Sequence, residues 1–231
     1  MSPPNLKILA YEDTDLGPLC LRRRELLSEP GTVVTEVTLN HEFLMSSYNT
    51  DSERAISNRS AEIHGGSNLK ALVGGFGLGY TAKELLTDPC VASVEVIEYL
   101  PQVLQWLKEG LIPLSDELND ADGLRLTSGD VYQYLLDEPQ QQYDLIVIDV
   151  DHSPADQLGS EEHVFYSKAG LKSAKKHLAD GGILAVWSYA ESSCFSEALE
   201  LTFSQTHVEP VRTFNPMVQE EQTDWLFFGV K

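Results

Sequence analysis

The chain has 231 residues, with 36 acidic against 16 basic side chains and a formal net charge of −20. A phosphate backbone needs a basic surface, so this charge disfavours nucleic acid as a partner and is compatible with a cationic small molecule. Solubility alone would also explain it. Apolar residues make up 42% of the chain, enough for a buried core. No apolar run approaches the roughly eighteen residues that cross a bilayer, so we expect no membrane attachment.

The three cysteines, Cys20, Cys90 and Cys194, are odd in number and widely spaced. This usage predicts reduced thiols and no disulfide framework. The first residues lack the charged-then-apolar plan of a signal peptide. We therefore expect a cytoplasmic protein, with a homodimer as one candidate assembly.

The first third of the chain reads as short β-forming runs separated by turn residues. Strands are predicted over residues 7–11, 19–23, 33–39 and 43–46. A helix is predicted over 51–63, followed by a short linker. We expect a small N-terminal β-module with its connecting helix over residues 1–64.

From residue 65 onward, strand and helix signals alternate, which favours a parallel sheet covered by helices. Strands are predicted over residues 71–73, 93–98, 124–127, 144–149 and 182–187, and helices over 81–86, 101–107, 131–136, 163–178 and 192–203. Two late runs, 208–214 and 225–230, are predicted to pair as an antiparallel hairpin. The predicted fold class is α/β and Rossmann-like, a mainly parallel seven-stranded sheet with an antiparallel last strand, forming a catalytic domain over 65–231.

A glycine loop follows the first strand of this domain. Gly75, Gly77 and Gly79 form a G-x-G-x-G pattern, and Glu98 ends the second strand about twenty residues on. This layout is typical of a nucleotide-binding β-α-β unit, in which glycine permits close backbone approach and the acid accepts hydrogen bonds from ribose hydroxyls. The dinucleotide fingerprint would need glycine at Tyr80. The pattern therefore favours S-adenosylmethionine (SAM) and the class I SAM-methyltransferase fold. The alternative is a tight turn beside a solvated Glu98.

Further acids follow the next two strands, where ligands bind in open parallel sheets. Asp130 follows the third strand, although it is equally suited to cap the helix after it. Asp149 ends the fourth strand, and Asp151 and His152 come directly after it. Paired carboxylates can hold a protonated amine or help to remove its proton, so Asp149, Asp151 and His152 are the candidate catalytic residues. Half of a divalent-metal site is the alternative, but no second Asp/Asn cluster follows the fifth strand, and we expect no metal.

Over nearly its whole length the chain resembles the spermidine synthase-like family of class I SAM-fold transferases. The similar segments are residues 43–46, the glycine loop, 94–98, 128–130, 143–149, 165–166, 180–183 and 225–230. The resemblance implies that Glu98 holds the ribose hydroxyls and Asp130 the adenine amino group. It also implies that Asp149 faces the reacting amine.

The chain departs from this family in three places. Polyamine-making members carry an aspartate within a GGGDGG loop, at the position of Gly77. That aspartate is expected to meet the amino end of decarboxylated SAM, so its absence puts this donor in doubt. The family's Tyr-His-Glu stretch before the linker is also missing. Its Asp-x-x-Asp-Pro loop becomes Asp149-x-Asp151-His-Ser-Pro154.

Three functions are consistent with these residues. The leading prediction is methyl transfer from SAM to a small nucleophile, for which an amine is one candidate. The second keeps the donor pocket but transfers aminopropyl from decarboxylated SAM to a diamine. The third is a nucleoside-binding module without turnover. In the leading prediction Asp149, helped by Asp151 or His152, orients the acceptor and takes its proton.

Overall fold

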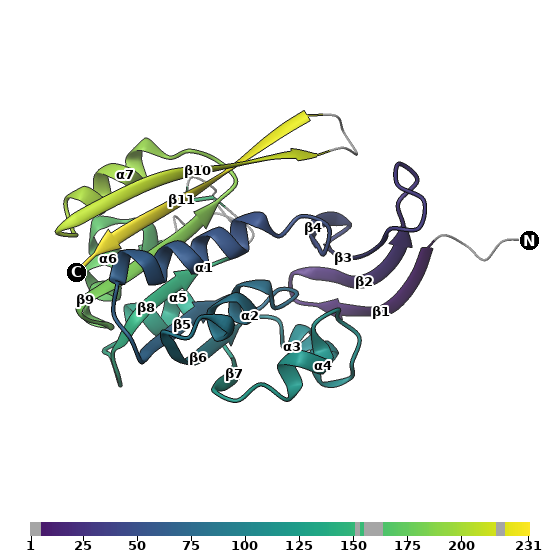
Figure 1. The fold of residues 1–231 in the computed structure, drawn as a ribbon, viewed down its shortest axis with the longest axis horizontal. Coiled ribbons are helices and arrows are strands. Elements are labelled where there is room, and N and C mark those ends of the chain that lie inside the picture. Colours follow the sequence, from purple (N-terminus) through teal and green to yellow (C-terminus); the bar gives the residue numbers. More distant parts are fainter. Residues whose placement is uncertain (1–5, 151–152, 155–163, 216–219) are drawn as a thin grey trace, which may run out of the picture.

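The computed structural model describes residues 6–150, 153–154, 164–215 and 220–231. The described residues form two sheets, a four-stranded sheet near the N-terminus and a seven-stranded sheet (Figure 1). Their orders are β1-β2-β3-β4 and β10-β11-β9-β8-β5-β6-β7. The predicted combination of a β-module and a larger α/β unit is therefore confirmed.

The N-terminal sheet is an antiparallel meander. Its strands are β1 (Leu6–Thr14), β2 (Gly17–Glu25), β3 (Val33–Leu39) and β4 (Glu42–Ser46). Asn40 and His41 form the tight turn between β3 and β4 with positive φ angles of 50° and 69°, which asparagine tolerates better than most residues. Leu19 and Leu21 alternate toward the protein interior and are fully buried.

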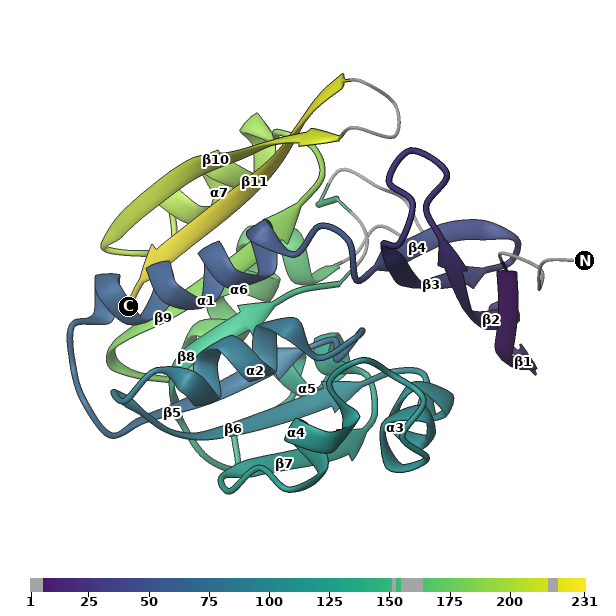
Figure 2. The same cartoon turned by 45° about the vertical axis from the view of Figure 1, so that its right-hand side comes forward.

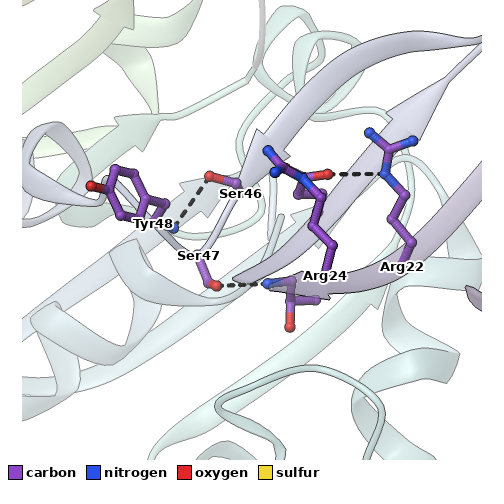
Figure 3. A network of polar contacts seen from close by, with 7 residues as sticks. Arg22, Arg24, Ser46, Ser47 and Tyr48 are labelled. Carbon is purple, nitrogen blue, oxygen red and sulfur yellow. Dashed lines mark hydrogen bonds and ion pairs between the residues drawn. The ribbon is translucent and has the colours of Figure 1, made fainter. Parts of the chain in front are cut away.

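The other face of β2 and β3 carries an ion-pair cluster around a buried glutamate, seen from close by in Figure 3. Glu36 is only 2% exposed, and its two carboxylate oxygens accept from Arg22 Nε at 2.9 Å and Arg24 Nε at 2.7 Å. A buried carboxylate is costly unless its charge is paired and hydrogen-bonded, and two guanidinium groups meet both needs. Beside it, the Ser47 hydroxyl accepts from the Thr35 amide at 2.9 Å, which fixes the chain after β4.

The larger sheet is parallel except at one side. Its strands are β5 (Leu69–Gly74), β6 (Val91–Glu98), β7 (Leu124–Ser128), β8 (Tyr143–Ile148), β9 (Leu178–Ser188), β10 (Gln205–Asn215) and β11 (Glu220–Val230). β5 to β9 pair in parallel, whereas β11 runs antiparallel to β9 and β10. The chain moves outward from β5 to β7 and then returns to β8 on the other side of β5. This order creates a topological switch point between β5 and β8, where α/β proteins bind ligands.

Helices cover both faces of this sheet (Figure 2). They are α1 (Asp51–His64), α2 (Tyr80–Thr87), α3 (Pro101–Lys108), α4 (Ser115–Asn119), α5 (Val131–Leu136), α6 (Lys168–Lys176) and α7 (Ser193–Glu200), with a 3₁₀ turn, η1 (Val164–Tyr166). α1 to α4 share one core and α5 to α7 the other. Alternate residues of each strand point into opposite cores, as Val147 and Ile148 do on β8. No helix in the described ranges has the length and apolar character needed to cross a membrane.

α1 joins the two sheets in sequence and lies along the larger one in space. It contacts α2, β8, β9, β10 and β11. The N-terminal sheet shares the core of α1 to α4, because Leu21 and Val37 belong to the same buried cluster as Leu104. The division of the chain at residue 64 stays a prediction, while these contacts place α1 on the face of the larger sheet.

Candidate active site

The glycine loop connects β5 to α2 and turns through left-handed backbone conformations. Gly75, Gly77 and Gly79 have φ angles of 90°, 53° and 90°, a region that other residues rarely occupy. A Cβ at Gly75 would overlap the carbonyl oxygen of Asp149, and one at Gly79 would press on Leu118. Glycine is therefore required here by turn geometry and by packing. Contact between the loop and a donor stays a prediction.

Gly77 lies where the N-terminal sheet meets this loop. A Cβ built on Gly77 would lie 3.0 Å from the Sδ atom of Met45, which belongs to β4. The aspartate that the family resemblance expects at this position would therefore have to displace a flexible methionine. In this chain residue 77 is glycine, and the Met45 side chain lies beside it.

Glu98 ends β6 and binds the glycine loop through its own carboxylate. Its Oε2 accepts from the Phe76 amide and its Oε1 from the Leu100 amide, each at 2.7 Å. The residue is 7% exposed, so it is buried and not a solvated strand end. Burial raises the pKa of the Glu98 carboxyl, and the backbone hydrogen bonds oppose that shift. Backbone hydrogen bonds from Gly77 and Tyr99 also favour the charged form of this carboxyl, and the predicted ribose contact stays a prediction.

Asp130 follows β7 and caps α5. Its Oδ1 accepts from the amides of Tyr132 at 2.8 Å and Gln133 at 3.3 Å. The capping role that the sequence offered for this residue is thus present. Its side chain is exposed, and the predicted contact with adenine is compatible with the cap.

Asp149 follows β8 and contacts the segment that carries the glycine loop. Its amide donates to the Gly74 carbonyl at 2.9 Å, and its Oδ2 accepts from the Thr81 hydroxyl. Burial raises the pKa of Asp149 to about 6; the hydrogen bond from Thr81 acts against this rise, and the charge of Asp224 adds to it. A carboxyl with this pKa is mostly ionised at neutral pH and can still exchange a proton there.

Two acids that the sequence analysis did not select lie beside Asp149. Burial, followed by the charge of Asp149, raises the pKa of Glu53 on α1 to about 8. Burial also raises the pKa of Asp224 on β11, against hydrogen bonds with Ser52 and Trp187. Three carboxyl groups, from α1, from the residue after β8 and from β11, thus interact electrostatically. No motif marks Glu53 or Asp224, because only the folded chain brings these elements together.

Asp151 and His152, the other two predicted catalytic residues, lie outside the described residues. Within the described ranges, no group of three or more His, Cys, Asp or Glu side chains is arranged to hold a metal ion. Because β6, β7 and β8 are parallel, Glu98, Asp130 and Asp149 follow strands that end at one edge of the sheet. This gathering at one edge follows from the parallel direction of the strands.

Two surface hollows lie outside this group of acids. One, between α1 and the β10–β11 pair, is crossed by the ion pair of Arg59 and Glu209 at 2.9 Å. The other lies beyond the end of β9 and is lined by Pro154, Tyr166, Glu191, Ser192, Ser193, Cys194 and Phe195. We place the candidate site at Asp149 because the glycine loop, the interacting carboxyls and the topological switch point meet there.

The family model described as "Spermine/spermidine synthase domain" matches residues 53–219, well over half of the chain. The chain belongs to this family. The match includes the glycine loop, Glu98, Asp130 and Asp149, and it confirms the family predicted from the sequence motifs.

Solved spermidine synthases have the same fold. The enzyme from Thermotoga maritima is 14% identical, with a TM-score of 0.75, over 97% of this chain and 73% of that chain. A spermidine synthase in complex with the transition state analogue AdoDATO is 15% identical, with a TM-score of 0.73, over 97% and 72%. A probable spermidine synthase from Corynebacterium glutamicum ATCC 13032 is 13% identical, with a TM-score of 0.66, over 99% and 81%. At these identities the likeness establishes the fold, and the predicted fold class is confirmed.

Family membership also decides which of the three predicted functions is supported. It confirms an enzyme of the alkyltransferase class. The leading prediction, methyl transfer, is not supported, and the family favours the aminopropyl alternative. The homodimer and the cytoplasmic location stay predictions.

Proposed function

We propose that the chain transfers an aminopropyl group from decarboxylated SAM to a small diamine. The observation that carries this proposal is the position of Asp149, at the switch point of a spermine/spermidine synthase domain and beside Glu53 and Asp224. Both reactants of such a transfer carry amines that are cations at neutral pH, and carboxyl groups attract them. SAM itself carries a carboxylate, which the same group of acids would repel.

The residues at the donor edge fit a nucleoside. The glycine loop would receive the donor, Glu98 would bind the ribose hydroxyls, and Asp130 would accept from the adenine amino group. The buried carboxylate of Glu98 is already held by the Phe76 amide of the loop and by the Leu100 amide, so its position is fixed before a donor binds. When bound, the donor supplies an electrophilic carbon next to its sulfonium sulfur. The task left to the protein is alignment and proton transfer.

Asp149 would act as the general base. Its ionised carboxylate takes one proton from the ammonium group of the acceptor. The lone pair of the acceptor nitrogen then forms the new C–N bond while the C–S bond breaks and its electron pair goes to sulfur. The product is a secondary ammonium ion, and the charge lost by the sulfonium appears on this nitrogen. The pKa of about 6 lets Asp149 accept a proton at neutral pH without being too weak a base.

Glu53 would respond to the arriving cation. With a pKa raised to about 8, its carboxyl is mostly protonated at neutral pH before the acceptor binds. An ammonium group nearby favours the charged form and lowers that pKa. Binding of a diamine should therefore release protons to the buffer, and the release should disappear in Glu53→Gln.

The test offers both donors to the purified chain. One reaction contains decarboxylated SAM with a panel of 1,3-diaminopropane, 1,4-diaminobutane and 1,5-diaminopentane, and a second contains SAM with the same amines. We expect methylthioadenosine and an aminopropylated amine, detected by mass spectrometry, only in the first reaction. Asp149→Asn is the control for protein-dependent turnover. Formation of S-adenosylhomocysteine in the second reaction, without turnover in the first, would overturn the proposal.

A further inference from the structure

Thr81 links the glycine-loop segment to the carboxyl group of Asp149. It is the second residue of α2, is 3% exposed, and donates its hydroxyl hydrogen to Asp149 Oδ2. A β-branched side chain in a helix has few χ1 rotamers, so the direction of this hydroxyl is restricted. A buried hydroxyl also needs a partner, and here the partner is the candidate base.

The backbone of Asp149 is fixed by the same segment. Its amide donates to the Gly74 carbonyl at 2.9 Å, and Gly75 packs so closely on its carbonyl oxygen that a Cβ would not fit. The loop therefore holds the main chain of Asp149, and the helix after the loop holds its side chain. The elements that would receive the donor and the group that would take the proton form one unit.

Thr81 is itself held from the other side. The hydroxyl of Ser57, a buried residue of α1, donates to the Glu53 carbonyl at 2.8 Å and lies 3.2 Å from the Thr81 carbonyl oxygen. α1 and α2 are thus tied together one helical turn from Glu53. This contact holds the backbone of Thr81 against α1.

We propose that Thr81 is a positioning residue that gives the two carboxylate oxygens of Asp149 different roles. Thr81 holds Oδ2, and Oδ1, which accepts no hydrogen bond from any residue of the described ranges, takes the proton of the acceptor amine. This inference rests on the proposed function for its second half. The contact between Thr81 and Asp149 stands without it.

The contact has a measurable electrostatic consequence. A hydrogen bond donated to a carboxylate favours its charged form, and the Thr81 hydroxyl lowers the pKa of Asp149 from the higher value that burial alone would give. Thr81→Val removes this donor at nearly constant volume, so the pKa of Asp149 should rise above about 6. A base works only when ionised, so activity lost on acidification should then be lost at a higher pH.

The first experiment needs neither donor nor acceptor. The chain is produced with ¹³Cγ-labelled aspartate, and the carboxyl signal of Asp149 is assigned with Asp149→Asn and followed by NMR against pH. We expect the midpoint to rise by roughly one pH unit in Thr81→Val and to stay near the wild-type value in Thr81→Ser. Thr87→Val, the same change at an exposed threonine of α2 whose hydroxyl bonds only Lys83, is the matched control. Equal midpoints in the wild type and Thr81→Val would overturn the positioning role.

The second experiment follows turnover. In the aminopropyl-transfer assay, Thr81→Val should lower kcat roughly tenfold or more, while the KM for the donor changes little. The acidic limb of the plot of kcat against pH should move to higher pH. Thr81→Ser should restore most of kcat. If Thr81→Val fails to fold, Thr81→Ala and Thr81→Ser provide the same comparison. A wild-type chain with a Thr81-dependent Asp149 titration but no turnover would overturn the proposed function and uphold the contact. Turnover with identical acidic limbs in wild type and Thr81→Val would overturn the contact's role in catalysis.

Discussion

Glu98 and Asp149 are carboxyl groups at the ends of the two strands that flank β5, the first buried and the second half-buried, and they are held in different ways. Glu98 accepts from two backbone amides at 2.7 Å, and no other acidic side chain contributes to its pKa. Asp149 accepts from one side-chain hydroxyl and lies beside Glu53 and Asp224. Amides of the main chain are permanent donors, so Glu98 is suited to hold a neutral ligand in place. A carboxyl crowded by other acids is suited to exchange a proton.

Asp149→Asn should have the largest effect, and it tests the proton-exchanging half of this comparison. The amide keeps the shape of the side chain but cannot accept a proton at neutral pH. Turnover should fall by roughly 10²–10⁴-fold, while affinity for methylthioadenosine, measured by calorimetry, stays near the wild-type value. A fully active Asp149→Asn would show that another group takes the proton.

Glu98→Ala tests the ligand-holding half. It removes charge-assisted hydrogen bonds of roughly 1.5–3 kcal/mol, so methylthioadenosine should bind at least about tenfold more weakly. Glu95→Ala is the matched control, because Glu95 lies on the same strand and bonds Gln141 and Tyr143 instead. Circular dichroism checks that both variants fold. Unchanged affinity in a folded Glu98→Ala variant would remove the donor site from this edge.

Glu53→Gln should change stability in a pH-dependent way. The pKa of Glu53 is raised to about 8 from an ordinary 4.5, so its contribution to folding is fully present below pH 4.5 and is lost as pH rises through 8. The variant should therefore gain about 1–3 kcal/mol of unfolding free energy relative to wild type at pH 9, with the difference shrinking toward pH 5. Urea unfolding at both pH values measures it.

Glu62→Gln on the same helix is the control, because the Glu62 side chain is 66% exposed. It should show no comparable change between pH 5 and pH 9. A pH-independent effect of Glu53→Gln would mean that the pKa of Glu53 is not raised in the folded chain.

Gly77→Asp should have the smallest effect, and it tests whether residue 77 influences the choice between decarboxylated SAM and SAM. The new acid would attract the amine of decarboxylated SAM and repel the carboxylate of SAM, shifting the affinity ratio by roughly tenfold or less. The left-handed backbone at 77 and the nearby Met45 should cost about 1–2 kcal/mol of stability. Gly77→Asn carries the same strain without the charge. Calorimetry with both donors compares them, and equal ratios in the two variants would place residue 77 away from the donor's amino-acid end.

Most of the fold could be predicted because apolar runs and turn residues mark its elements directly. The helix over 131–136 and the strand over 33–39 lie where the sequence placed them. α4 was not predicted, since Ser115–Asn119 is short, polar and without a side-chain cap. The late runs were predicted as a hairpin, but β10 and β11 extend several residues further than their apolar centres.

The candidate site was only half predictable. Glu98, Asp130 and Asp149 stand at strand ends, where the sequence alone signals a ligand edge. Glu53 and Asp224 are far from Asp149 along the chain, and a helix and a hairpin must dock before they meet. Their role depends on tertiary contacts that leave no local pattern. The role of Thr81 likewise could not be predicted from the sequence, because it depends on the hydrogen bond from its hydroxyl to Asp149.

The ion-pair cluster of Glu36, Arg22 and Arg24 in the N-terminal sheet limits the order in which its members can be substituted during evolution. Arg22 and Arg24 share one buried carboxylate, so losing Glu36 would leave two guanidinium groups in mutual repulsion. Losing one arginine leaves the carboxylate still paired with the other. Substitutions should therefore be accepted in a fixed order, an arginine first and the glutamate last, and related sequences without an acid at position 36 should lack at least one of the two arginines.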